Sequence, residues 1–167
     1  MKLYIVRHAI AAEAEEAEAD SQRPLTEKGR RKMRKIALGL KELEGTVDLI
    51  LTSPYLRAAQ TAQVLGRVFS LEKDRVIETE HLTPMGFPDQ LIQLVNEGHP
   101  EAGGIMLVGH EPYLSRLISM LVSGDSNLSL NFKKGGVCRL SLDQLQYGRC
   151  ATLDWLLFPS QLAEIGN

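Results

Sequence analysis

Residues 1–9 read MKLYIVRHA, and they are the best starting point for predicting the architecture of this chain. The apolar run at residues 3–7 is typical of a strand buried in a parallel sheet. This strand ends in Arg7 and His8, two adjacent side chains that can both carry positive charge. The pair is either an accident of a strand end or the delivery of a nucleophile and an anion-binding group to one point. The ends of the other strands decide between these readings.

Strand signals and helix signals alternate along the rest of the chain. Short apolar runs predict three further parallel strands, at residues 48–52, 75–79 and 105–109. Two runs with rough alternation predict an antiparallel pair at a sheet edge, at residues 137–142 and 150–157. Strand followed by helix, several times over, is the pattern of a mainly parallel sheet with helices on both faces.

The helices between these strands have recognisable starts. Thr26 is a suitable N-cap for a helix over residues 27–43. Three more helices are predicted: one from Pro54 with Ser53 as its N-cap, one over residues 88–97 and one from Pro112. There is no internal repeat and no inter-domain linker, so residues 1–167 are expected to form a single domain.

Composition excludes several classes of function. Hydrophobic residues make up 44% of the 167 residues and charged residues 24%, which is ordinary for a globular protein. The net charge of −2 and the aromatic content of 5% argue against nucleic acid or a membrane surface as the partner. Cys138 and Cys150 show no metal-binding or redox spacing and are expected to be reduced. No signal peptide or membrane-spanning run is found, so a cytoplasmic protein is expected.

Two histidines and two arginines follow the predicted strands. Arg7 and His8 end the first strand, Arg57 lies in the first turn of the helix after residues 48–52, and His110 follows the strand at 105–109. The carboxyl ends of parallel strands lie on one side of a sheet, where ligands bind in this architecture. The four side chains are therefore expected to converge.

These residue types suit the binding and transfer of a phosphoryl group. Arginine offers a planar fork that matches two phosphate oxygens, and helix N-termini add backbone N–H groups. A neutral imidazole can attack phosphorus in line and form a covalent phosphohistidine. Arg7, Arg57 and the second histidine can then stabilise the charge of the transition state. No cofactor or metal is needed, and no residue spacing predicts a metal site.

The segments VRHA, PLTEKG, LTSPYLRAAQTA and LVGHEP resemble the motifs of the histidine phosphatase superfamily, the phosphoglycerate-mutase-like enzymes. The short chain, PLTEKG and HLTP resemble the small SixA-type phosphohistidine phosphatases within it. The resemblance implies a three-layer αβα sandwich. It matches Arg7 and His8 to the family's Arg-His-Gly motif, Arg57 to its second arginine and His110 to its second histidine. These four residues are thereby implied to bind the substrate as well.

The sequence departs from the family pattern at two points. Ala9 stands where the family usually has glycine, a small change that we expect the backbone to tolerate. The proton donor is not fixed, because Glu80, His81 and Glu111 all stand at positions where relatives carry it. An imidazole leaving group has a pKa of about 6.5 and can depart protonated. An enzyme that cleaves an N–P bond can therefore manage with an imperfect proton donor, which favours a phosphohistidine substrate over a phosphate ester.

Two charged segments have no assigned role. Residues 11–20 read AAEAEEAEAD and are either a solvated insertion or an acidic flap that selects among anionic substrates. The helix at 27–43 carries six cations that form either a solvated face or a docking patch for an acidic phosphoprotein: Lys28, Arg30, Arg31, Lys32, Arg34 and Lys35.

The expected function is a metal-independent phosphatase that acts through a phosphohistidine at His8. Its substrate is a phosphorylated protein, such as a histidine-containing phosphotransfer domain in signal transduction, or a small phosphorylated molecule. A phosphatase for a small phosphate ester and a phosphate-binding module without turnover are the alternatives.

Overall fold

A computed structural model describes residues 1–14 and 19–167. Within them one sheet has the strand order β3-β2-β4-β1-β5-β6. The strands are β1 (Lys2–Arg7), β2 (Leu49–Thr52), β3 (Val76–Glu78), β4 (Gly104–Gly109), β5 (Val137–Ser141) and β6 (Thr152–Leu157). The first four pair in parallel, while β5 is antiparallel to β1 and β6 is antiparallel to β5. The predicted parallel sheet with an antiparallel edge is confirmed.

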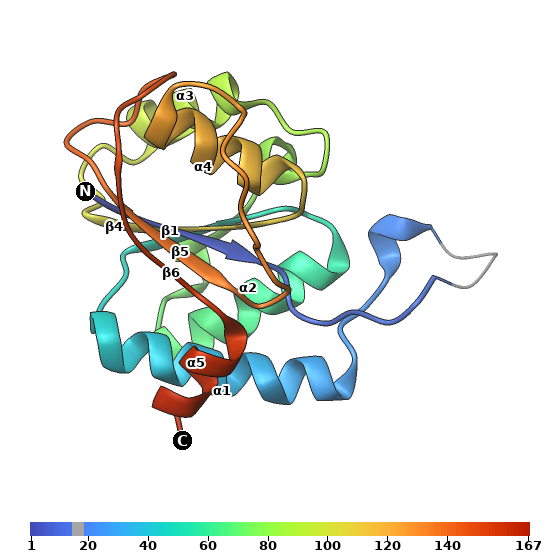
Figure 1. Ribbon diagram of the computed structural model, residues 1–167. Helices are drawn as coiled ribbons and strands as arrows, with labels where there is room; N and C mark the ends of the chain where they lie inside the picture. Colours follow the sequence, from blue (N-terminus) through green and yellow to red (C-terminus); the bar gives the residue numbers. More distant parts are fainter. Residues whose placement is uncertain (15–18) are drawn as a thin grey trace.

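Helices cover both faces of this sheet. They are α1 (Glu27–Glu44), α2 (Leu56–Phe69), α3 (Pro88–Gly98), α4 (Tyr113–Ser123) and α5 (Pro159–Ile165). Figure 1 shows α1, α2 and α5 on one face and α3 and α4 on the other. Short 3₁₀ turns precede or follow the regular elements, as η1 (Asp20–Gln22), η2 (Lys73–Arg75) and η3 (Glu80–Leu82). The three-layer αβα sandwich is confirmed.

Strand β1 lies between the two hydrophobic cores and contributes side chains to each. Leu3 and Ile5 belong to the core under α3 and α4, whereas Tyr4 and Val6 belong to the core under α1 and α2. All four side chains are fully buried, so a shift of β1 by one residue would exchange the two sets of side chains. The register of β1, and with it the position of the residues that follow it, is therefore strongly determined.

Two predicted helix starts are wrong. Helix α2 begins at Leu56 and not at Pro54, and its N-cap residue is Tyr55, which makes no side-chain capping bond. The Ser53 hydroxyl instead accepts the Tyr55 N–H, which holds this segment as a turn before the helix. Helix α4 likewise begins after Pro112, which occupies the N-cap position. In both places a turn separates the strand from the helix.

Helix α5 was not predicted from the sequence, and it explains a glycine inside α1. Gly39 is buried in the middle of α1, where glycine is unfavourable. A Cβ atom at this position would lie 1.9 Å from the Leu162 carbonyl oxygen of α5. The close approach of the two helices therefore requires glycine there.

Two further observations concern membrane-spanning helices and the two cysteines. In the part of the chain that the structure describes, no helix has the length and apolar character needed to cross a membrane. Cys138 and Cys150 are both free thiols, as predicted, and Cys138 is buried.

Candidate active site

The pairing of β1 with β4 places the two predicted histidines side by side. Arg7 pairs with Gly109 at the ends of these strands, and the His8 N–H donates to the Gly109 carbonyl at 3.1 Å. The rings of His8 and His110 therefore face one another, with their centroids 5.0 Å apart and their planes tilted by 52°. Both side chains are almost completely buried.

Arg57 reaches the same point from the first turn of α2. Its Nε atom donates to Nε2 of His8 at 3.3 Å, and only 5% of the residue is exposed. Its guanidinium also lies over the Tyr55 ring, 5.2 Å from the centroid. The predicted convergence of an arginine and two histidines at the carboxyl edge of the sheet is therefore present in the structure.

Hydrogen bonds define which nitrogen of His8 is protonated. Nδ1 lies 2.8 Å from the Ala9 carbonyl oxygen, which can only accept, so the proton is on Nδ1. Nε2 consequently carries a lone pair, and it accepts the bond from Arg57. The Ala9 N–H in turn donates to the Thr61 hydroxyl at 3.1 Å. Ala9 is buried, and both its N–H and its carbonyl make hydrogen bonds. The methyl group that replaces the family's glycine is therefore accommodated at this position.

The ring of His110 is held by Ser53. Its Nε2 atom lies 2.8 Å from the Ser53 hydroxyl oxygen, which also accepts the Tyr55 N–H. Nδ1 is buried and has no hydrogen-bond partner among the described residues. A buried nitrogen without a partner is costly, so this atom is available for a group that binds between the two rings.

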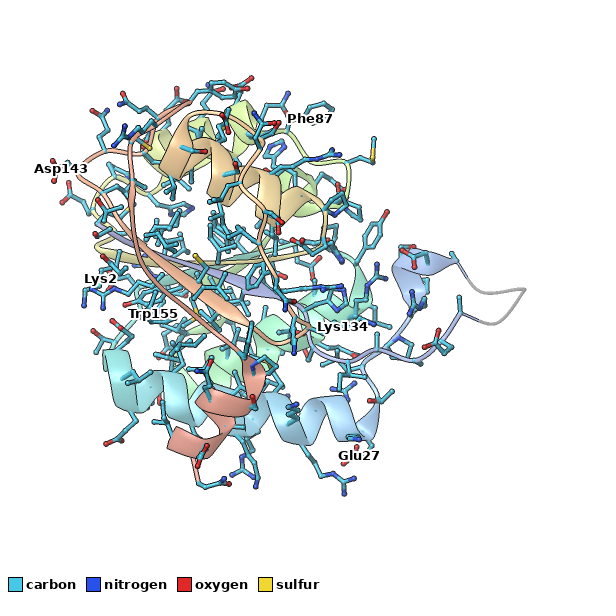
Figure 2. All side chains as sticks on the ribbon, in the orientation of Figure 1. Lys2, Glu27, Phe87, Lys134, Asp143 and Trp155 are labelled. Carbon is cyan, nitrogen blue, oxygen red and sulfur yellow. The ribbon has the colours of Figure 1, made fainter. Side chains whose placement is uncertain are left out.

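Arg7 lies at the end of β1, and the loop before β5 covers this end. Its Nη1 atom donates to the Phe132 carbonyl at 2.7 Å, while Nε is buried with no partner within the described residues. The Gly135 N–H is directed at the carbonyls of Arg7 and His8 and ties this loop to β1. The loop also brings Lys134 close enough to influence His8, and Figure 2 labels Lys134 beyond the carboxyl end of β1. Sequence reasoning missed this cation.

Burial and nearby cations keep both imidazoles neutral. Burial lowers the pKa of His8 to about 4, and the charges of Arg57 and Arg7 act in the same direction. Burial likewise lowers the pKa of His110 to about 3, with a further contribution from its neighbour His8. Burial also lowers the pKa of Arg7, although the charge of Glu111 opposes this change. At neutral pH the site therefore combines two uncharged imidazoles with cationic guanidinium groups.

The three proton-donor candidates lie in different surroundings. The Glu111 carboxylate accepts the backbone N–H and the hydroxyl of Ser115 and so caps α4. It also interacts with the charge of Arg7. Glu80 is exposed, and His81 is half-buried with a buried Nδ1 atom that lacks a partner in the described ranges. Among the described residues, neither Glu80 nor His81 has a hydrogen bond to the two histidines or two arginines.

A carboxylate that the sequence analysis did not assign also reaches the site. Asp20, the last residue of the acidic stretch 11–20, binds the Arg57 guanidinium through its carboxylate at 2.9 Å. Residues 15–18 of that stretch lie outside the described residues. Elsewhere in the described chain no group of three or more His, Cys, Asp or Glu side chains is arranged to hold a metal ion.

Comparison with known proteins identifies the family to which this chain belongs. Residues 3–89 match the model of the histidine phosphatase superfamily, branch 1. The chain is 31% identical to the phosphohistidine phosphatase SixA of Escherichia coli K12 over 97% of this chain and 96% of that protein. It is 30% identical to a SixA homolog of Haemophilus influenzae over 72% of this chain and 77% of the relative.

A solved structure shows the same relationship in three dimensions. The protein histidine phosphatase SixA complexed with tungstate has a TM-score of 0.80 to this chain at 30% identity. The match covers 97% of this chain and 99% of that one. This chain therefore belongs to the histidine phosphatase superfamily of hydrolases, as its motifs indicated.

The state of the two imidazoles can be tested by titration. Because the pKa values of His8 and His110 are lowered, each ring should stay neutral as the pH falls through 6.5 and gain a proton only near pH 4 or below. We expect ¹⁵N chemical shifts of the free enzyme to show the Nδ1–H tautomer of His8 at pH 7. A His8 ring that is half-protonated near pH 6.5 would contradict this description of the site.

Proposed function

We propose that this protein is a metal-independent phosphatase that removes phosphoryl groups from phosphohistidine on proteins, acting as a single domain through a phosphohistidine intermediate on His8. The observation that carries the proposal is the lone pair of His8 Nε2, which faces Arg57 at 3.3 Å beside the ring of His110. An uncharged imidazole at this place has the lone pair that a nucleophile needs.

In the first step, the substrate displaces the Arg57 Nε–H from the lone pair of His8 Nε2, and Nε2 attacks phosphorus as the bond to the leaving group breaks on the opposite side. Arg57 and Arg7 bind the non-bridging oxygens, where charge develops in the transition state. The Ser53 hydroxyl can donate to Nε2 of His110, which leaves the proton on Nδ1 to donate to a third oxygen. In the second step, water attacks phosphorus and the bond to His8 breaks, which releases phosphate and the free enzyme.

The nature of the leaving group supports phosphohistidine as the substrate class. A departing alcohol needs a proton donor, whereas an imidazole has a pKa of about 6.5 and can leave protonated. Of the three candidate donors, Glu111 is the one with a recorded interaction with the cluster, and its carboxylate is already bonded to Ser115. A carboxylate that already accepts hydrogen bonds at the start of α4 is a weak proton donor. Such a donor suffices for cleavage of an N–P bond but is poorly suited to hydrolysis of an ester. The relatives named phosphohistidine phosphatases point the same way.

The leaving-group argument predicts different effects of two substitutions. Arg57→Ala should abolish hydrolysis of phosphate esters and phosphoramidates alike, because both need the oxygen-binding arginine. Glu111→Gln should reduce ester hydrolysis about tenfold or more while phosphoramidate hydrolysis changes little. Steady-state kcat on an alkyl phosphate and on a phosphoramidate, side by side, measures both effects. Equal losses on the two substrates in Glu111→Gln would refute the argument.

The proposed function is tested by comparing substrates and trapping the intermediate. We expect the enzyme to hydrolyse a phosphorylated histidine-containing transfer domain faster than a panel of phosphorylated metabolites. Rapid quenching in alkali should show acid-labile phosphate on His8, and His8→Asn should remove both the adduct and turnover. Preference for a metabolite would favour the alternative of a small-ester phosphatase. Absence of turnover on every substrate would favour a phosphate-binding module.

A groove between α1 and α2 supports a protein partner. It has a volume of about 570 Å³ and an apolar floor, and it is lined by Arg30, Arg31, Arg34, Leu38, Val64, Arg67 and Val68. Four like charges around one groove repel each other, and an acidic partner relieves that repulsion. Among the described residues, one ion pair involves these four arginines, and it joins Arg31 to Glu27 at 4.0 Å.

The two helices that line the groove, α1 and α2, also connect it to the candidate active site. The Thr26 N–H, one turn before Arg30, donates to the Ile10 carbonyl two residues after His8. Val64 lies two turns after Arg57 on α2, about 10 Å along the helix axis. A phosphoprotein bound at His8 could therefore reach the groove with an acidic helix. This is our proposal for the basic patch of α1, in a cytoplasmic phosphorelay where thiols stay reduced.

Charge reversal in the groove tests this docking. The double substitution Arg30→Glu and Arg34→Glu should raise KM for a phosphoprotein at least tenfold and leave KM for a small phosphoramidate unchanged. A matched control, Lys73→Glu with Arg75→Glu, makes the same charge change at η2, whose residues do not line the groove. High salt should reduce the difference in KM for the phosphoprotein between the two double variants. Equal KM values for the two doubles would exclude docking at the groove.

A further inference from the structure

Asp20 accepts hydrogen bonds from the two terminal nitrogens of the Arg57 guanidinium. Nη1 of Arg57 donates to the Asp20 carbonyl at 2.6 Å, and Nη2 donates to the Asp20 carboxylate at 2.9 Å. The third nitrogen, Nε, is the one that faces His8. One residue therefore binds two nitrogens of the guanidinium and leaves the third directed at the reacting imidazole.

Asp20 is itself fixed in place by a second arginine. Its other carboxylate oxygen accepts from Nη1 of Arg23 at 2.9 Å, and Nε of Arg23 donates to the Ala12 carbonyl at 2.8 Å. The hydrogen bond from Arg23, together with that from Arg57, keeps the pKa of Asp20 below its usual value. Asp20 is therefore an anion at neutral pH, and its position does not depend on Arg57 alone.

The rigidity of the guanidinium gives these contacts a consequence for catalysis. The group is planar, so binding Nη1 and Nη2 also sets the direction of Nε. A guanidinium has five N–H groups, and the bonds to Asp20 use two of them. The Nε–H that His8 releases on attack and two further N–H groups remain for phosphoryl oxygens. A long side chain held in this way is oriented before substrate arrives, and less ordering is required in the transition state.

The same contact has an electrostatic cost. The Asp20 carboxylate adds negative charge next to a guanidinium that must bind a phosphoryl dianion. More than half of the Asp20 side chain is exposed, so solvent screens this repulsion and keeps it modest. The repulsion acts on bound phosphate in every complex, whereas the orientation of Arg57 matters most when charge develops on the oxygens.

We propose that Asp20 is a positioning residue, which orients Arg57 toward His8 and weakens the binding of free phosphate. This role gives a function to the carboxyl-terminal end of the acidic stretch 11–20. It rests on His8 and Arg57 as the reaction centre, as in the proposed function, and holds whichever leaving group departs.

Two substitutions at Asp20 separate geometry from charge. Asn keeps an oxygen that accepts from Nη2 but removes the charge, and Ala removes both. We expect Asp20→Ala to lower kcat on an aryl phosphate and a phosphoramidate about tenfold, the scale of a hydrogen bond to a charged group. Asp20→Asn should retain most of kcat. Both variants should bind inorganic phosphate roughly two- to fivefold more tightly, the scale of an exposed charge pair.

A matched control removes a charge from the same segment without touching Arg57. Glu13 is exposed, and Glu13→Gln should leave both kcat and phosphate affinity at the wild-type values. Isothermal titration with phosphate measures affinity without turnover, so it remains informative if no substrate is hydrolysed and the proposed function fails. Thermal melting reports whether each variant folds, and Asp20→Asn stays informative if Asp20→Ala does not.

The outcomes are distinct. A loss of kcat in Asp20→Ala together with tighter phosphate binding supports positioning. An unchanged kcat in Asp20→Ala, weaker phosphate binding in either variant, or an equal effect of Glu13→Gln would overturn the proposal. A merely structural role would weaken phosphate binding and lower kcat together, because a disordered Arg57 would bind every oxyanion poorly.

Discussion

The parallel pairing of β1 with β4 is the constraint from which the candidate active site follows. Each strand is buried on both faces, and the alternation of Leu3 and Ile5 with Tyr4 and Val6 allows one register between the two cores. That register aligns the ends of the strands, and the residues that follow them, His8 and His110, consequently meet. Strand β2 lies on the other side of β4, and its connection to α2 brings Arg57 to the same edge.

The electrostatics of the site follow from the depth of this edge. Burial keeps both imidazoles uncharged, and the cations around them reinforce that effect. The positive charge is held by carbonyls and carboxylates outside the reacting centre, with Phe132 on Arg7 and Asp20 on Arg57. These contacts leave Nε of Arg57 facing His8 and Nε of Arg7 without a partner among the described residues. The proposed phosphoryl group would therefore be attracted to a place where two uncharged imidazoles lie beside cationic guanidinium groups.

Helices and strands could be predicted from local pattern, but their connections could not. Thr26 caps α1 as predicted, because a hydroxyl three residues before an available N–H is a local feature. Ser53 also has a hydroxyl but does not cap α2 as predicted. It accepts the Tyr55 N–H and bonds to His110, which is distant in sequence. Helix α5 was missed because its seven residues are stabilised by packing on α1, where Gly39 makes room for the Leu162 carbonyl.

The sequence by itself predicted the parallel sheet, the helices on both of its faces and the candidate set of two histidines and two arginines. The hydrophobic period and the positions of the strand ends are local properties of the sequence, and parallel topology brings those ends to one edge. Only the tertiary structure decided which atoms face each other. The hydrogen bond between Ser53 and His110, the position of Lys134 near His8 and the bonds from Arg57 to Asp20 all join residues far apart along the chain. The tautomer of His8 depends on the backbone conformation at its neighbour Ala9. Such contacts depend on how side chains pack between helices and strands, and this packing cannot be predicted from the spacing of residues in the sequence.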